Sequence, residues 1–243
     1  MSGQVWYVGP GGTDTTTPQG LQRQYPLATF AQAYTNAAAG DGIVFLEGHA
    51  ETLTVAQTLA KAGIHIVSEG SGSDRATFTC NGAIAMFDIT AAGVWLDNIL
   101  FPASSTAPTA RVRTASTKTR VTSCEFLCGA SDTAAALKFV TGAGQGIVED
   151  CTFTSTATAG ASRPAIGIEV ANAMSDLEVR DTIFDGGTYG WSDYALKGTA
   201  AITRLYAKGM SLLNGSDVYA ATGSIYRVHV ANKSGGSRLV LTA

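Results

Sequence analysis

Five short phrases repeat one order of apolar and polar positions along the second half of the chain. Each runs from an aliphatic residue through a polar residue, a turn-former and a small residue to a final Phe or Leu. The phrases are 94–101, 121–126, 148–153, 179–184 and 205–212. Their final residues are 25, 27, 31 and 28 positions apart. A repeat of this length predicts stacked units, none of which buries its apolar face alone.

The spacing inside each phrase predicts a strand, a tight corner and a second strand. The phrases are too short for helices and are rich in Val, Ile, Thr and Phe, which favour strands. In each phrase the final residue and the residues two and five positions before it are mostly apolar. Side chains alternate between the two faces of a straight strand, so these three positions cannot all lie on one face. A corner between the fifth and the second position before the end would bring them to the same face. Asn, Asp and Gly tolerate a left-handed corner. The corner position holds Asn98, Ser123, Asp150, Asp181 and Gly209.

Stacking the phrases in register predicts columns of like side chains inside the fold. The main column is expected to hold Phe101, Phe126, Phe153 and Phe184, followed by Leu212. Cys124 and Cys151 share another column and are expected to be small apolar filler. Cys124 and Cys128 have a spacing that metal sites also use, but no His lies near them. We therefore expect free thiols, no metal and no other cofactor.

A capping box precedes the repeats. Thr29 and Gln32 have the spacing of a helix N-cap and its reciprocal partner, and Gly40 suits the other end, so a helix is expected over 30–39. A solenoid exposes strand edges at its ends, and this helix is expected to cover the N-terminal one. The expected segments of a single domain are 1–42 (strand, loop and capping helix), 43–231 (solenoid) and 232–243 (hinge and terminal strand or arm).

The repeated phrase resembles the corner of the pectate-lyase-type right-handed parallel β-helix, over roughly 43–230. The resemblance implies an all-β chain folded as a single-stranded right-handed parallel β-helix with an N-terminal capping helix. Segments 48–52, 64–67 and 70–78 are similar to β-helix proteins that tailed bacteriophages encode among their virion genes. That narrower likeness implies a non-catalytic virion protein, a capsid-decoration or tail-associated subunit, commonly trimeric. Its expected neighbours are copies of itself and virion proteins such as the major capsid protein.

Composition fits this expectation. Charged residues make up 14% of the chain, against about 25% in an average domain, which favours faces covered by other copies in a homotrimer. The net charge of −3 and the lack of a basic cluster argue against nucleic acid. No apolar run is long enough to span a membrane. The first residues resemble no signal peptide, so synthesis in the host cytoplasm and assembly into the virion are expected.

Four residues are candidates for the interface between copies. Tyr189 and Trp191 share a Gly-rich loop with Asp185 and Asp193. These aromatic side chains suit either sugar stacking or an inter-subunit anchor, and we favour the anchor. Leu239 and Leu241 lie in a terminal strand that continues past the last repeat, as a lid on the last coil or an arm reaching a neighbour.

The alternative is a polysaccharide-degrading enzyme or short tailspike depolymerase of the same fold. The resemblance implies carboxylate-held calcium and an arginine base in lyases, and two or three aspartates in hydrolases. The catalytic candidates are Glu149, Asp150, Glu178, Arg180 and Asp181. In register, Glu149 and Arg180 stack on adjacent coils about 5 Å apart. Columns of this kind are more often solvated ion-pair faces, so the sequence favours the non-catalytic protein.

Overall fold

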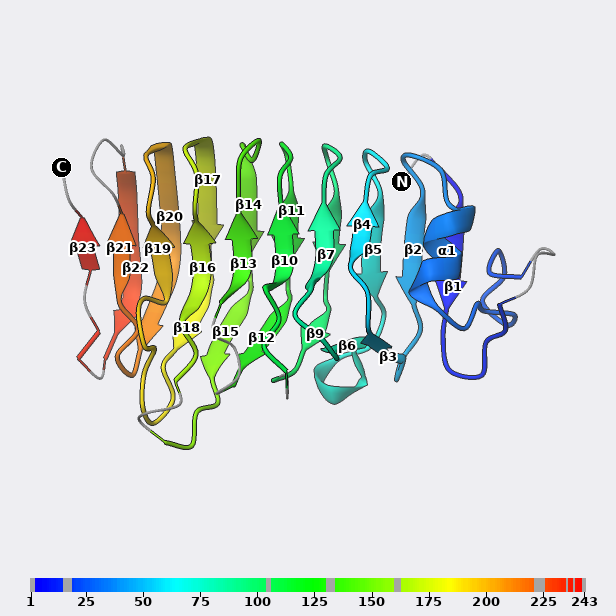
Figure 1. Cartoon of the computed structure of the whole chain (residues 1–243), viewed down its shortest axis with the longest axis horizontal. Coiled ribbons are helices and arrows are strands. Elements are labelled where there is room, and N and C mark those ends of the chain that lie inside the picture. Colours follow the sequence, from blue (N-terminus) through cyan, green and yellow to red (C-terminus); the bar gives the residue numbers. More distant parts are fainter. Residues whose placement is uncertain are drawn as a thin grey trace.

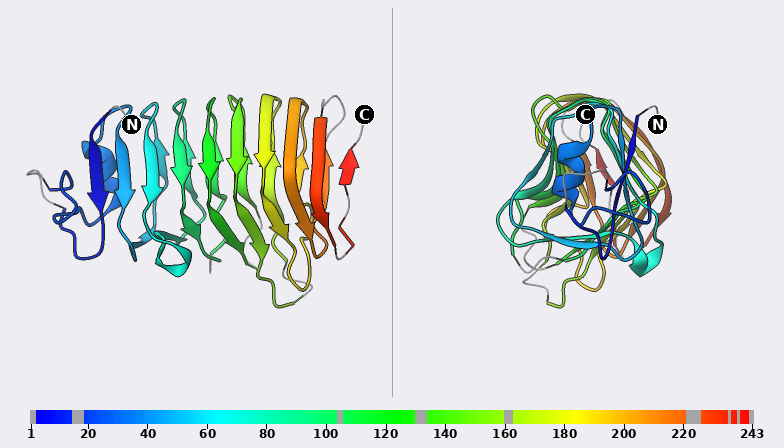
Figure 2. Two further views of the ribbon diagram at one scale, coloured as in Figure 1. Left: turned by 180° about the vertical axis from the view of Figure 1, so that it is seen from behind. Right: turned by 90° about the vertical axis from the view of Figure 1, so that its right-hand side faces the viewer.

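The chain folds as an all-β parallel solenoid. The computed structural model describes residues 3–14, 19–103, 106–129, 134–159, 163–220, 226–234, 236–237 and 239–241. Every strand pairing among these residues is parallel, and successive coils follow one another along a single axis (Figure 1). Seen from the end, the coils surround one interior (Figure 2). The predicted solenoid architecture is confirmed.

Three faces surround this interior. The first face contains β1 (Val5–Val8), β2 (Gly42–Phe45), β5 (His65–Ser68), β8 (Trp95–Asp97), β11 (Arg120–Thr122), β14 (Gly146–Glu149), β17 (Met174–Arg180) and the start of β20 (Ile202–Leu213). The second face contains β3 (Ala50–Leu53), β6 (Thr77–Cys80), β9 (Leu100–Phe101), β12 (Glu125–Cys128), β15 (Thr152–Ser155), β18 (Ile183–Asp185) and the end of β20.

The third face is a separate sheet. It contains β4 (Gln57–Leu59), β7 (Ala85–Ile89), β10 (Ala110–Thr114), β13 (Ala135–Phe139), β16 (Ile166–Val170), β19 (Leu196–Gly198), β21 (Val218–Ala220) and β23 (Leu239–Leu241). By contrast, β20 runs through the corner between the first two faces and pairs with both β17 and β18. The strand β22 (Tyr226–Lys233) pairs with β20 and extends beyond position 231, where the solenoid was expected to end.

The predicted left-handed corners are confirmed. The five corner residues have positive φ angles: Asn98 57°, Ser123 53°, Asp150 52°, Asp181 44° and Gly209 69°. At each of the first four corners the backbone N–H donates to a carbonyl of the next coil, at 2.8–3.1 Å. The side chain of Asn98 also donates to the carbonyls of Ser68 and Gly70. Corner conformation and strand register are therefore fixed by the same residues.

Inward-facing columns form the core. Phe101, Phe126, Phe153, Phe184 and Leu212 are consecutive register partners. All five side chains are fully buried, and the neighbouring rings stack with centroids 4.6–5.2 Å apart. Cys124 and Cys151 lie in the next inward column, and all four cysteines of the chain are buried, free thiols.

The helix α1 (Phe30–Asn36) is shorter than the expected span of 30–39. It begins as predicted, because the Thr29 hydroxyl accepts the N–H of Gln32. It ends early because Ala37 is extended and the carboxylate of Asp41 captures the N–H of Ala38. Gly40 therefore lies outside the helix end that it was expected to cap. The helix lies at the N-terminal end of the solenoid (Figure 1).

The C-terminal strand continues its own sheet. In β23, Leu239 and Leu241 are the register partners of Val218 and Ala220 in β21 of the same chain. Of the two expectations for this segment, the pairing of its backbone within the chain fits a lid on the last coil and not an arm that reaches a neighbour. The side chains of Leu239 and Leu241, and residues 238 and 242, lie outside the described residues.

Candidate functional site

The outer side of the first face carries two parallel columns of mainly polar and aromatic side chains. The central column is His65, Trp95, Arg120, Ile147, Glu178 and Tyr206. The adjacent column is Val67, Asp97, Thr122, Glu149, Arg180 and Lys208. Neighbours within a column come from successive coils, so each side chain lies about 5 Å from the next along the axis. The first face therefore presents polar, charged and aromatic side chains in regular rows.

The N-terminal half of the central column is a closed stack. The His65 ring is stacked on that of Trp95, with the ring centroids 4.0 Å apart. Arg120, the register partner of Trp95 in the next coil, places its guanidinium 4.7 Å from the centroid of the Trp95 ring. The Trp95 indole donates to the Thr122 hydroxyl, which donates to Asp97, each at 2.6 Å. Burial raises the pKa of Asp97, but His65, Thr122 and Arg120 lower it more, so it lies below its ordinary value. The faces of Trp95 are covered, and the ring offers no open platform to a ligand.

Glu149 and Arg180 occupy the register predicted for them. They are direct strand partners, with Arg180 Nη1 3.9 Å from Glu149 Oε1. The other oxygen of Glu149 lies 2.7 Å from Arg120 Nη2, and Arg180 also pairs with Glu178. These half-exposed groups therefore form a network of ion pairs in which each charge already has a partner.

Asp150 and Asp181 stand apart from this network at the exposed corner. They are successive corner residues, so both carboxylates lie on the edge between the first and second faces. Partial burial and the negative charges of Glu149 and Asp181 raise the pKa of Asp150. Among the described residues, no group of three or more His, Cys, Asp or Glu side chains is arranged to hold a metal ion.

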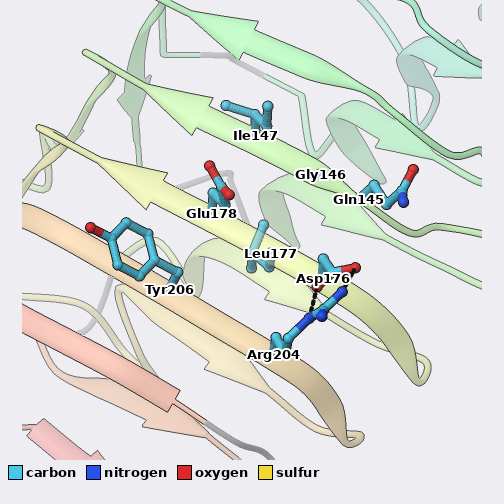
Figure 3. A pocket seen from close by; sticks show the side chains of 8 residues that line it. All are labelled: Gln145, Gly146, Ile147, Asp176, Leu177, Glu178, Arg204 and Tyr206. Atoms are coloured by element: carbon cyan, nitrogen blue, oxygen red, sulfur yellow. Dashed lines mark hydrogen bonds and ion pairs between the residues drawn. The ribbon is translucent and has the colours of Figure 1, made fainter.

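A hollow of about 450 Å³ opens on the first face one strand further on; of its lining residues, only Glu178 was a candidate from the sequence. It lies over β14, β17 and β20 (Figure 3). Its lining residues are Gln145, Gly146, Ile147, Asp176, Leu177, Glu178, Arg204 and Tyr206. In Figure 3, Glu178 and Tyr206 lie toward one end and the Asp176–Arg204 pair toward the other. The hollow thus combines an aromatic ring with separate acidic and basic groups.

Strand alternation explains how these groups reach the surface. Along β17, Asp176 and Glu178 point outward while Leu177 between them is fully buried. Two contacts join Asp176 to Arg204, one of them 3.0 Å long from Nη2 to Oδ2. The hydrogen bond from Arg204 holds the pKa of Asp176 below its ordinary value, so this carboxylate is an acceptor at neutral pH. Tyr206 is 37% exposed and leaves its ring available.

The third face carries a second charged column that sequence reasoning also missed. Its members are Asp88, Arg113, Lys138, Glu169 and Lys197. Arg113 lies 3.0 Å from Asp88, and Lys138 lies 2.9 Å from Glu169, so the charges pair along the column. The signal in the sequence is a charge between two apolar residues at 87–89, 137–139 and 168–170, and between Val112 and the buried Thr114 at 112–114. Because these charges neutralise one another, the column is a weaker candidate than the hollow.

The two aromatic candidates for an interface have different environments. Trp191 is only 4% exposed, and its indole donates to the Ser216 hydroxyl at 3.1 Å. Its predicted role as an inter-subunit anchor is therefore corrected, because the ring is already packed inside its own chain. Tyr189 is 41% exposed and remains a predicted contact residue.

Comparisons with known proteins give structural neighbours. No protein-family model and no curated protein sequence matches the chain. Among solved structures, pectate lyase Pel9A is similar over 95% of this chain and 78% of its own, at 12% identity and a TM-score of 0.48. A rhamnogalacturonan lyase is similar over 89% and 75%, at 10% identity and a TM-score of 0.45.

Both structural neighbours are named as lyases, so the expectation that the chain is non-catalytic is corrected to the extent that its solved neighbours in fold are enzymes; at 10–12% identity the likeness is one of fold alone. That expectation came from the resemblance to virion β-helix proteins and from the ion-pair column of Glu149 and Arg180, and it took no account of the hollow beside Glu178. No helix among the described residues has the length and apolar character needed to cross a membrane.

Proposed function

We propose that the protein is a saccharide-binding solenoid whose first face holds part of a polysaccharide chain in the hollow at Glu178 and Tyr206. One observation carries the proposal: a 37%-exposed tyrosine ring stands in an open hollow of about 450 Å³ beside Glu178. A hollow of this size suits one or two sugar rings. The flat, parallel outer face lets the rest of an extended chain continue along the solenoid.

The chemistry of the lining supports this ligand class. A tyrosine ring offers an apolar surface to the C–H side of a sugar and a hydroxyl for hydrogen bonding. Asp176 and Glu178, the latter paired with Arg180, carry carboxylate oxygens that can accept hydrogen bonds from sugar hydroxyls, while Arg204 and Gln145 carry N–H donors. Because Arg204 is fixed by Asp176, the polar groups are oriented before a ligand arrives.

The same residues raise the question of cleavage. Asp176 and Glu178 are two positions apart on one side of β17, so their Cα atoms are about 7 Å from each other and both carboxyl groups lie on the same face. Glycoside hydrolases use carboxylate pairs about 5–10 Å apart. A bound polysaccharide is therefore tested for cleavage as well as for affinity.

The experiment is affinity electrophoresis and calorimetry against neutral and acidic polysaccharides. We expect at least one to bind, and Tyr206→Ala to weaken binding about tenfold, equivalent to ~1.4 kcal/mol. Tyr25→Ala, at a 59%-exposed tyrosine outside the hollow, is the matched control and should bind as the wild type does. Mass spectrometry of the incubated polysaccharide, with Glu178→Gln beside the wild type, detects cleavage. Failure of all polysaccharides to bind, or equal binding by Tyr206→Ala, contradicts the proposal.

We propose as the biological setting a tailed-phage particle in which the protein is a parallel homotrimer that contacts other virion proteins such as the major capsid protein. The outer side of the second face supports self-association. Its register column is Thr77, Leu100, Glu125, Thr152, Ile183 and Ser211. Glu125 is its one charge, and it is paired with Arg75. Such a column packs against a copy of itself without like-charge repulsion.

Light scattering after size-exclusion chromatography tests the trimer. A mass about three times 25.0 kDa, unchanged on dilution, supports it, whereas 25.0 kDa contradicts it. Ile183→Lys, which places a charge at a 39%-exposed position of the second face, should release monomers. Immunogold labelling of particles tests the virion location.

Two finer features of the fold belong to the same proposal. We infer a right-handed solenoid, because parallel crossover connections are right-handed in about 98% of cases. We also infer that α1 caps the N-terminal end. In support, the Phe30 ring lies 5.3–6.3 Å from the rings of Phe45, Phe78 and Phe87, and Lys61 Nζ donates to carbonyls at the end of the helix. Phe30→Asp should then expose the first coils to aggregation, and a crystal structure tests the handedness.

A further inference from the structure

A second hollow, of about 310 Å³, is lined by two loops of successive coils and by Arg163 from the coil before them. One loop is 186–192, between β18 and β19, and the other is the turn 214–215 after β20. Its lining residues are Arg163, Gly187, Thr188, Tyr189, Gly190, Trp191, Asn214 and Gly215. In contrast with the hollow on the first face, it contains no carboxylate in its lining.

The walls of this hollow are held in place from behind. The loop closes through a hydrogen bond of 2.7 Å from Gly190 N–H to the Gly186 carbonyl, and Gly186 N–H donates to Leu213 of the next coil. Positive φ angles at Gly187 (60°), Gly190 (75°) and Asn214 (52°) produce the tight path. Behind the loop, the buried Trp191 is anchored to Ser216. The hollow is therefore formed before any ligand binds.

Arg163 brings to this hollow a positive charge that forms no ion pair with a carboxylate of the described residues. Its only hydrogen bond among the described residues is a long one, 3.4 Å from Nη1 to the Tyr189 carbonyl. No carboxylate in the described part of the chain lies within ion-pair distance of it, whereas Arg113 and Arg204 each pair with an aspartate. The nearby Asp185 already accepts the Gly187 N–H and the Asn214 side chain, each at 2.8 Å.

We propose that this hollow binds a tetrahedral oxyanion, a sulfate or phosphate group carried by a larger ligand. The Arg163 guanidinium supplies a forked donor for two of its oxygens. Thr188, Tyr189 and Asn214, whose side chains carry hydroxyl or amide donors, also line the hollow. Donors that come from three separate stretches of the chain suit a tetrahedral group, whose oxygens point in several directions, better than a planar carboxylate.

The test is calorimetric titration of the full chain with sodium sulfate and, separately, with inorganic phosphate, at constant ionic strength. We expect Arg163→Gln to weaken binding about tenfold, the effect of losing hydrogen bonds to a charged group. Arg163→Lys keeps the positive charge but loses the paired N–H donors of the guanidinium, so its affinity for the anion should lie between those of the wild type and Arg163→Gln. The tighter of the two anions indicates whether a sulfate or a phosphate ester is the natural group.

The control is Arg23→Gln, at an arginine whose side chain is 60% exposed and pairs with Glu69, which should leave anion binding unchanged. Thermal unfolding of each variant verifies the fold. Equal binding by the wild type and Arg163→Gln overturns the proposal, as does equal competition by chloride. Arg163-dependent binding of galacturonate tighter than that of sulfate and phosphate overturns the tetrahedral assignment. This hollow shares no lining residue with the one at Tyr206, so the result of this test and the result of the saccharide-binding test are independent of each other.

Discussion

Phe126 and Phe153 stack face to face in adjacent coils, with ring centroids 4.6 Å apart and planes within 1° of parallel. Their backbones are register partners, so the ring spacing follows the spacing of the strands. Each ring fills part of the interior of its own coil and packs against the ring of the next coil.

Replacing one ring in this column should therefore destabilise two coils at once. We expect Phe153→Ala to lower the free energy of unfolding by about 3–5 kcal/mol, because the side chain is fully buried. Phe153→Leu retains most of the volume and should cost less. Denaturant titration followed by circular dichroism measures both, and a loss below about 1 kcal/mol for the alanine variant would contradict the packing described.

The corner at Asp150 should respond oppositely to two substitutions. Its φ of 52° is tolerated by Asn and strains a β-branched residue, so Asp150→Val should destabilise the protein. Asp150→Asn should stabilise it at pH 7, since it removes repulsion with Glu149 and Asp181.

The ionisation of Asp150 should make the stability of the protein depend on pH in a definite direction. Its pKa is raised in the folded protein, so the native state disfavours the ionised form, and stability falls as pH rises through that pKa. The advantage of Asp150→Asn should therefore appear as pH rises above the ordinary value of 3.8 and vanish in stronger acid. A constant difference between the two proteins at every pH would assign the effect to backbone preference alone.

Asp41 should make the N-terminal end acid-sensitive. Burial raises the pKa of Asp41. The hydrogen bonds from the N–H groups of Ala38, Trp6 and Gln4 and the charge of Lys61 lower it by more than burial raises it, so the pKa lies below the ordinary value of 3.8. Its stabilising effect is present above the ordinary pKa and is lost as pH falls through the lowered native value. Asp41→Asn should cost about 1–3 kcal/mol at pH 7 and flatten the acid limb of a stability profile. An unchanged acid limb would contradict this assignment.

The thiols should be inert in the native protein. Burial raises the pKa of Cys151 well above its ordinary value, and the neighbouring Cys124 thiol raises it further, so the reactive thiolate is scarce. A thiol reagent at pH 8 should label no cysteine until denaturant is added, while an exposed Tyr25→Cys control should react at once. Mass spectrometry that shows a disulfide in unreduced protein would contradict the free-thiol state.

The sequence predicted the interior of this fold better than its surface. Five phrases share both a core column and a corner, and the two constraints admit one register. Asn98 and Asp150 could be assigned to corners because few residue types tolerate that backbone. The helix end was harder, since Asp41 ends α1 through a side-chain contact that no local pattern encodes.

The sites were less predictable because they depend on which strands lie side by side. Asp176 and Arg204 are 28 residues apart and meet only because β17 and β20 are neighbours. Trp191 looked exposed in its Gly-rich loop, yet those glycines let the loop fold back over the ring. The charged triplets of the third face become a column only after the coils are aligned.

The alternation of inward and outward residues also makes the solenoid extensible. Each coil meets the next through the same column of rings and the same left-handed corner, whatever its outer side chains are. Duplicating a coil such as 96–120, which lies before the hollow, would insert one more coil and lengthen the solenoid by about 4.8 Å. The hollow at Glu178 and Tyr206 would move along the axis intact, because the strands that build it are neighbours in a later part of the stack. The length of this molecule and the chemistry of its faces can therefore be changed independently.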